Sequence, residues 1–195
     1  YVIPPDRSLK MVDGHLVLIG AGAEHRGYAS VITRTFPANG RFAPAQRALH
    51  DLVGAAHAAA LALARPGIAY EAGHHAAVET LTDGLLSLGL LKGKLRKNID
   101  DGSYKRFYRH KTGHWLGLDV HDVGDYRIDG ESRLLEPGMV FTIEPGLYVS
   151  PDDTSVDAKW RGIGIRTEDD VAITKDGHHV LTGKLARSAD EIEAL

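Results

Sequence analysis

Residues 114–124 read HWLGLDVHDVG, and the four residues before them, 110–113, read HKTG. The three histidines of this stretch, His110, His114 and His121, lie within twelve positions, and glycines at 113 and 117 let the backbone approach a ligand closely. Histidine is the commonest neutral metal ligand and a proton carrier near pH 7. On histidine count alone, a buried loop whose imidazoles bond backbone carbonyls explains the stretch as well as a functional site does.

Two glutamates further along the chain each follow an apolar run. Glu144 follows Met139 to Ile143, and Glu168 follows the segment from Ile163 to Thr167. A carboxylate at the end of an apolar strand is costly to bury unless a cation or hydrogen bonds receive it. Imidazole and carboxylate ligands together suit Zn, Mn, Fe or Co. The sequence therefore predicts a divalent metal as the common partner of the two glutamates and the histidine stretch.

Four motifs in order carry a resemblance to a known family. They are residues 114–124, 135–140 (LEPGMV), 144–148 (EPGLY) and 162–170 (GIGIRTEDD). Together they closely resemble the catalytic domain of Xaa-Pro aminopeptidases and prolidases, which share the pita-bread or creatinase fold with methionine aminopeptidase. The resemblance covers the chain from about Asp13 onward. It implies an α+β fold, a mainly antiparallel curved sheet with helices packed on it.

The resemblance also implies a set of site residues. In the family, two aspartates, one histidine and two glutamates hold a pair of divalent ions, and a water or hydroxide between the ions attacks the Xaa-Pro carbonyl. Glu144 would also handle the proton of that water, and Glu168 would bridge the two ions. The implied residues are His114, Glu144 and Glu168 as metal ligands, His110, His121 and Glu144 as catalytic groups, and His110, His121, Tyr148 and Arg166 as the substrate pocket.

Two ligand positions depart from the family pattern, because Gly20 and Val31 stand where the family has aspartates. Four carboxylates would balance two divalent ions, and the remaining Glu144 and Glu168 balance only one. We therefore do not expect two-metal occupancy: the site holds either no metal or one weakly bound divalent ion (Mn, Zn or Co). Without metal, repulsion between the two glutamates should raise the pKa of one of them unless Arg166 or a histidine compensates. The alternative is that Gly20 and Val31 are ordinary strand residues and the ligand strands lie elsewhere.

Three functions remain open from the sequence. The first, which the lost aspartates favour, is a catalytically impaired or inactive Xaa-Pro aminopeptidase-like protein. The second is a working metallopeptidase that uses one ion to release the N-terminal residue of Xaa-Pro peptides. The third is a metal-free binding or interaction module, since fold alone does not assign function.

Composition and charge exclude several classes of protein function. A net charge of −3 from 23 basic and 26 acidic residues gives no basic footprint for nucleic acid, and the absence of cysteine excludes thiolate chemistry. The most apolar stretch, Ala55 to Ala64, is far shorter than the roughly 20 residues of a membrane span. We expect a cytoplasmic protein whose partners are proline-containing peptides, with a homodimer compatible with the family. One pita-bread domain should span residues 1–195, N-terminally shortened because the family has further elements upstream.

The periodicity of apolar residues predicts the individual elements. His15 to Ile19 should pair with Gly27 to Phe36 as a hairpin, and residues 92–105 should be a mobile loop. His74-His75 and His178-His179 should be surface pairs, and Trp115 and Trp160 packing residues. The other predicted elements are an extended lead-in at Pro4-Pro5, helices over Pro44–Arg65, Tyr70–Leu88 and Ser188–Leu195, a strand over Met139–Val149 broken at Pro145-Gly146, and a strand over Ile163–Ile173.

Overall fold

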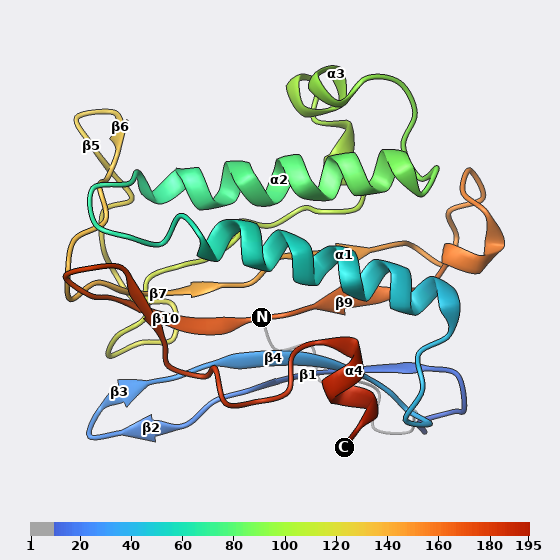
Figure 1. Cartoon of the computed structure of the whole chain (residues 1–195), viewed down its shortest axis with the longest axis horizontal. Coiled ribbons are helices and arrows are strands. Elements are labelled where there is room, and N and C mark those ends of the chain that lie inside the picture. Colours follow the sequence, from blue (N-terminus) through green and yellow to red (C-terminus); the bar gives the residue numbers. More distant parts are fainter. Residues whose placement is uncertain (1–9) are drawn as a thin grey trace.

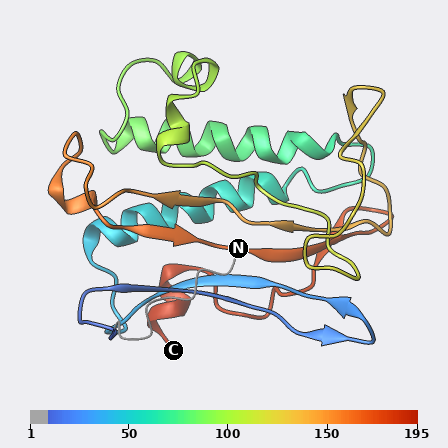
Figure 2. The same ribbon diagram turned by 180° about the vertical axis from the view of Figure 1, so that it is seen from behind.

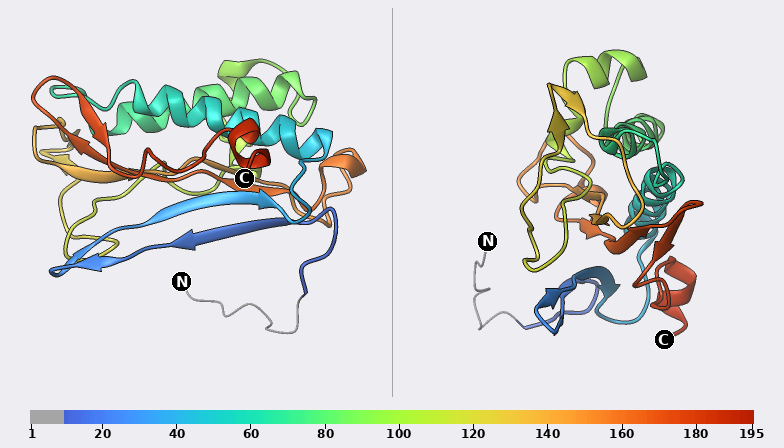
Figure 3. Two further views of the ribbon diagram at one scale, coloured as in Figure 1. Left: turned by 60° about the horizontal axis from the view of Figure 1, so that its bottom comes forward. Right: turned by 90° about the vertical axis from the view of Figure 1, so that its left-hand side faces the viewer.

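The structure, a computed structural model, describes residues 10–195, and the lead-in predicted at Pro4-Pro5 lies outside them. Two long helices lie side by side over a layer of strands (Figure 1): α1 spans Pro44–Leu61 and α2 spans Tyr70–Ser87. Seen end-on in Figure 3, both helices stand on one side of the strand layer, which curves away from them. Among the described residues no helix is both long and apolar enough to cross a membrane.

Both long helices follow the predicted pattern. Pro44 occupies the first turn of α1, where its missing N–H costs nothing. The helix buries a stripe that includes Leu49, Val53 and Ala56, all fully inaccessible to solvent. Burial of each leucine or valine side chain stabilises the fold by about 1.5–3 kcal/mol. The first helix ends at Leu61, four residues earlier than predicted, whereas α2 ends within one residue of its predicted end.

Every strand pair in the described structure is antiparallel. Figure 2 shows from behind that the pair formed by β1 (Leu16–Ala21) and β4 (Ile32–Pro37) runs along one side of the layer, with the remaining long strands between it and the helices. The strands are β1 Leu16–Ala21, β2 Glu24–His25, β3 Tyr28–Ala29, β4 Ile32–Pro37, β5 Arg127–Ile128, β6 Glu131–Ser132, β7 Val140–Ile143, β8 Gly146–Tyr148, β9 Gly164–Arg166, β10 Asp169–Ile173 and β11 His178–Val180.

The strand registers bring four distant residues into one line across the layer. Gly20 on β1 pairs with Thr33 on β4, and Thr33 forms a bridge with Glu168. Glu168 in turn lies between the pairs Gly146↔Arg166 and Asp169↔Ile143, opposite Glu144. The predicted hairpin and the interrupted strand over Met139–Val149 are therefore confirmed. The strand predicted over Ile163–Ile173 is itself interrupted at residues 167–168 and forms β9 and β10. Together these strands place two glutamates and Gly20 in the same row.

The loop predicted for residues 92–105 is wrong, because this segment forms helix α3 (Leu95–Asp100) and a 3-10 helix, η1 (Ser103–Arg106). Ion pairs one turn apart, Arg96 with Asp100 and Lys97 with Asp101, support the short helix. The glycines that suggested a loop, Gly93 and Gly102, lie on either side of α3, and both have positive φ. The predicted terminal helix is confirmed as α4 (Ala189–Glu193), with Ser188 as its cap.

Candidate metal centre

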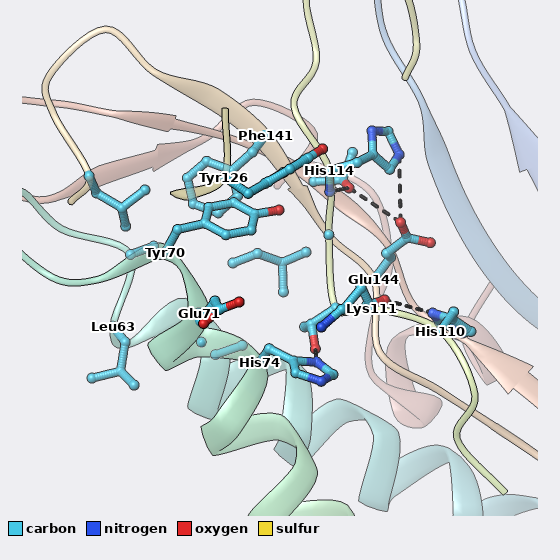
Figure 4. Close-up of a pocket in the computed structure, with 18 of the residues that line it drawn as sticks. Leu63, Tyr70, Glu71, His74, His110, Lys111, His114, Tyr126, Phe141 and Glu144 are labelled. Atoms are coloured by element: carbon cyan, nitrogen blue, oxygen red, sulfur yellow. Dashed lines mark hydrogen bonds and ion pairs between the residues drawn. The ribbon is translucent and has the colours of Figure 1, made fainter. Parts of the chain in front are cut away.

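All three predicted ligands come together in the folded chain. His114, Glu144 and Glu168 each offer one ligand atom, and these atoms all lie within 4.8 Å of one another. Nε2 of His114 is 3.5 Å from Oε1 of Glu144, the contact drawn in Figure 4. Glu144 follows the end of β7, and Glu168 lies between β9 and β10. His114 lies in an extended segment beside β7. Its backbone carbonyl accepts a hydrogen bond from the backbone N–H of Thr142.

The orientation of His114 suits a metal ligand. Its Nδ1–H donates to the backbone carbonyl of Trp115 at 2.9 Å, which leaves Nε2 as the acceptor that faces Glu144. Burial lowers the pKa of His114, so the ring is neutral near pH 7. Metal-binding histidines usually donate their other ring N–H to a carbonyl or carboxylate in this way.

The two carboxylates are buried, with Glu144 8% exposed and Glu168 3% exposed. Burial first, and the charge of Glu168 second, raise the pKa of Glu144 to about 7. The predicted rise is thus present, although burial contributes more to it than repulsion does. Glu168 accepts a short hydrogen bond from the hydroxyl of Thr33, a contact that the sequence did not predict.

This donor set fits one divalent ion. It combines a neutral imidazole with two carboxylates whose negative charge is unfavourable in a buried place, and a cation would relieve that cost. Three protein ligands with further positions left open are typical of a catalytic rather than a structural metal site.

Gly20 and Val31, the positions at which the family resemblance implies aspartates, border this cluster. A Cβ atom placed on Gly20 would lie 3.5 Å from Oγ1 of Thr33 and 4.0 Å from Nη2 of Arg166, with nothing else within 4 Å outside its chain neighbours. Val31 contacts the surroundings of the cluster through its backbone: its N–H donates a hydrogen bond to Oδ2 of Asp170 at 3.2 Å. Neither Gly20 nor Val31 has a side-chain atom that can bind a metal.

Two buried aspartates follow Glu168 and point to opposite sides. Asp169 faces α1, where Nε2 of His57 lies 3.2 Å away, and it also pairs with Arg34 at 2.7 Å. Because side chains alternate along a strand, Asp170 shares the face of Glu168. Burial, and then the charges of Glu168 and Asp169, raise the pKa of Asp170 to about 6, although the N–H of Val31 partly offsets this.

The predicted substrate-pocket residues also gather here. Nδ1–H of His110 donates to the Lys111 carbonyl, and its Nε2 accepts from the hydroxyl of Tyr148 at 2.9 Å. The ring of His121 packs edge-on against that of His114, with centroids 4.1 Å apart. Nε of Arg166 donates to Thr33 at 3.4 Å.

A cavity of about 560 Å³ opens beside the cluster. Figure 4 shows Glu144 and His114 at one side of it and Tyr70 and Phe141 at the other. The lining includes His74, which the sequence assigned to the surface. That assignment is wrong: His74 is half-buried, and its Nδ1 is hydrogen-bonded to the hydroxyl of Thr112 at 2.7 Å. The signal was available, because His74 lies four residues after Tyr70 on the face of α2 that carries the buried residues.

Residues 1–175 match the family model of metallopeptidase family M24. The chain belongs to this family. It is 48% identical to the Xaa-Pro aminopeptidase of Escherichia coli over 97% of its own length and 43% of that protein. Its identity to human Xaa-Pro aminopeptidase 3 is 38%, over 94% of this chain and 35% of the human protein. The chain thus spans less than half the length of these relatives.

Solved structures agree with the M24 assignment. Pseudomonas aeruginosa aminopeptidase PepP superposes with a TM-score of 0.92 and 54% identity, over 93% of this chain and 41% of that one. Two structures of E. coli aminopeptidase P, each with one aspartate replaced by alanine, also reach 0.92, at 49% and 48% identity over 95% of this chain and 42% of theirs. The predicted fold class, the mainly antiparallel pita-bread fold of the M24 family, is therefore confirmed.

Proposed function

We propose that this chain is an Xaa-Pro aminopeptidase-like protein with a degenerate dinuclear metal site, and that it is impaired or inactive on Xaa-Pro peptides. One observation carries the proposal. Gly20 stands in the same cross-strand row as Glu168 and Glu144 and faces the cluster, yet has no carboxylate to offer it.

The relatives support the placement of the two lost ligands. The two E. coli aminopeptidase P structures with an aspartate-to-alanine replacement concern different aspartates, whose separation along the chain equals that of Gly20 and Val31. A further structure of the E. coli enzyme is described as zinc-substituted and in complex with product. The matching separation supports the assignment of Gly20 and Val31 to ligand positions over the alternative that they are ordinary strand residues.

Charge limits what the remaining residues can bind. With Glu144 and Glu168 as the carboxylates, the proposed site holds one divalent ion, bound with His114. Such an ion would act as a Lewis acid and lower the pKa of a bound water. A two-metal site also clamps the attacking and leaving oxygens, and the loss of one ion removes several kcal/mol of transition-state stabilisation.

The chain's own residues have defined tasks under this proposal. In the metal-free chain the pKa of Glu144 is raised to about 7, so this carboxylate can hold a proton near neutral pH and must release it when an ion binds. His110, oriented by the Lys111 carbonyl and Tyr148, faces the cavity together with Arg166, so these residues would orient a bound peptide. Proline-containing peptides are the proposed ligand class.

The test combines metal analysis with an assay of Xaa-Pro hydrolysis in the presence of added Mn, Co or Zn. The natural chain should bind at most one ion and turn over slowly or not at all. The double variant Gly20→Asp/Val31→Asp should bind a second ion and gain turnover. As a matched control, Ile19→Asp adds a carboxylate to the opposite face of β1. This variant should change neither the number of bound ions nor the turnover.

Two outcomes would refute the proposal. Efficient hydrolysis by the natural chain with a single bound ion would establish the working single-metal peptidase instead. Two well-occupied ions in the natural chain would contradict the degenerate site itself.

A further inference from the structure

We propose that the open space beside Gly20 is a binding site for a carboxylate group, which the guanidinium of Arg166 holds. The inference goes beyond the proposed function, because it requires neither a bound metal nor turnover. The ligand class is a small carboxylate, either a free acid or the terminal carboxylate of a peptide.

Gly20 leaves room for a β-carbon. A Cβ atom at Gly20 would lie 3.5 Å from Oγ1 of Thr33 and 4.0 Å from Nη2 of Arg166, with no other atom within 4 Å outside its chain neighbours, so nothing crowds this position. Gly20 is exposed, so a solute can reach this position. The side chain of aspartate beyond Cα is chemically an acetate group. A free acetate would lie further out than that side chain, because its methyl carbon must stay about 3.5–4.0 Å from Cα of Gly20, on the side where Nη2 of Arg166 lies.

Arg166 supplies the charge that such a ligand needs. Within residues 10–195, no aspartate or glutamate oxygen lies within 4.0 Å of its guanidinium, whereas Arg34 and Arg127 each pair with a carboxylate. The side chain is only partly exposed, so salt and solvent screen its attraction for a bound carboxylate less than they would at a fully exposed site. Its polar contacts are to hydroxyl groups: Nε donates to Thr33, and Tyr148 lies close enough to interact with it.

The chemistry of arginine favours a carboxylate over other anions here. The planar guanidinium presents paired N–H donors that match the two oxygens of a carboxylate. A phosphate would bring additional negative charge towards Glu144 and Glu168, which already act on Arg166 electrostatically. One carboxylate, with one negative charge and the size of the absent side chain, fits better.

The experiment titrates metal-free protein with acetate and follows amide NMR signals. Metal is removed on a chelating resin, since a soluble chelator would itself carry carboxylates, and chloride keeps the ionic strength constant. Acetate should shift the signals of Gly20 and Thr33 saturably, with a millimolar Kd. Acetamide, which has the same shape without the charge, should not.

Variants locate the site. Gly20→Asp fills the space with a covalent carboxylate, and Arg166→Gln removes the cation, so each should weaken acetate binding at least about tenfold. The matched control is Arg127→Gln. Arg127 also lines the cavity, but it already pairs with Glu71, so the Arg127→Gln variant should bind acetate as tightly as the natural chain does. If Gly20→Asp binds acetate as tightly as the natural chain, or if no saturable shift occurs, the proposal is overturned.

A second comparison identifies the source of the carboxylate. The dipeptide Ala-Pro with a free C-terminus is compared with its C-terminal amide as a competitor of acetate. Displacement by the free acid alone identifies a peptide terminus as the ligand. If acetate binds and neither peptide competes, the site takes small free acids. Both results support the proposed site, and neither depends on whether the chain binds manganese or hydrolyses Xaa-Pro peptides.

Discussion

His114 donates its Nδ1 proton to the Trp115 carbonyl, so Nε2 alone remains to accept a metal. The loss of a hydrogen-bond partner around a metal ligand typically costs 10–100-fold in affinity, so the loss of the ligand itself should cost at least about 100-fold. We predict this reduction in Mn²⁺ affinity for His114→Ala, measured by calorimetric titration. His75→Ala, an exposed histidine on α2, serves as the control and should bind Mn²⁺ like the natural chain. Equal affinity of His114→Ala and the natural chain would exclude His114 as a ligand.

His74 should make stability depend on pH. Burial first, and the charge of Lys111 second, lower its pKa from 6.5 to about 4. The unfolded chain then binds the proton more readily than the folded one, so this contribution to stability is complete above pH 6.5 and is lost as pH falls towards 4. His74→Gln, which cannot titrate, should lose less stability over this range, by a difference on the order of 1 kcal/mol after allowance for solvent screening. Urea unfolding at several pH values measures this, and parallel curves for both proteins would contradict it.

Among the elements, the two long helices contain glycines with opposite effects. A Cβ atom on Gly84 of α2 would lie only 2.2 Å from Cδ1 of Leu52 on α1, whereas Gly54 has open space around it. Gly54→Ala should therefore stabilise the fold by up to about 1 kcal/mol through helix propensity. Gly84→Ala must displace Leu52 and should be less stable than Gly54→Ala by about 1–3 kcal/mol. Equal unfolding midpoints for the two variants in urea would show that Leu52 moves aside freely.

At the same scale, sequence patterns predicted those elements that local periodicity specifies. Pro44 marked the start of α1, Gly89 marked the end of α2, and the capping residue Ser188 marked α4, whereas Pro66-Gly67 placed the end of α1 four residues too late. The sequence patterns did not predict α3, because six helical residues give too short a window for periodicity and the flanking glycines suggested a loop. Ion pairs within α3 and its contact with α2 outweigh that local signal.

Across the whole molecule, Asp169 links parts of the chain that are far apart in sequence. It is fully buried and pairs with Arg34 of β4, with His57 of α1 and with Arg187 near the C-terminus. Removing one partner from a buried ion pair leaves the other charge uncompensated, so Asp169→Ala should lower the free energy of unfolding by about 3–5 kcal/mol. The exposed Asp152→Ala is the control and should change it little. If both variants unfold at the same denaturant concentration, Asp169 does not link these elements.

The site could be predicted only in part, for a reason that belongs to the whole molecule. His114, Glu144 and Glu168 were found because each lies in a recognisable motif. Thr33 and Asp170 were missed, because their place beside the cluster depends on the register between β4 and residues 168–170, which are far apart in sequence. No local pattern encodes such a register. The prediction for His74 failed because a histidine in a polar helical segment was taken for a surface residue.

The strand that carries Gly20 has one further consequence. Over the described part of the chain, β1 pairs with β4 alone, and Leu18 and Ile19 are 37% and 48% exposed. A strand with a free row of N–H and C=O groups and apolar side chains is a template for another chain in the same extended conformation. Concentrated solutions of this protein should therefore be prone to fibrous aggregation that starts at β1. The variant Ile19→Lys should lengthen the lag time before such solutions become turbid.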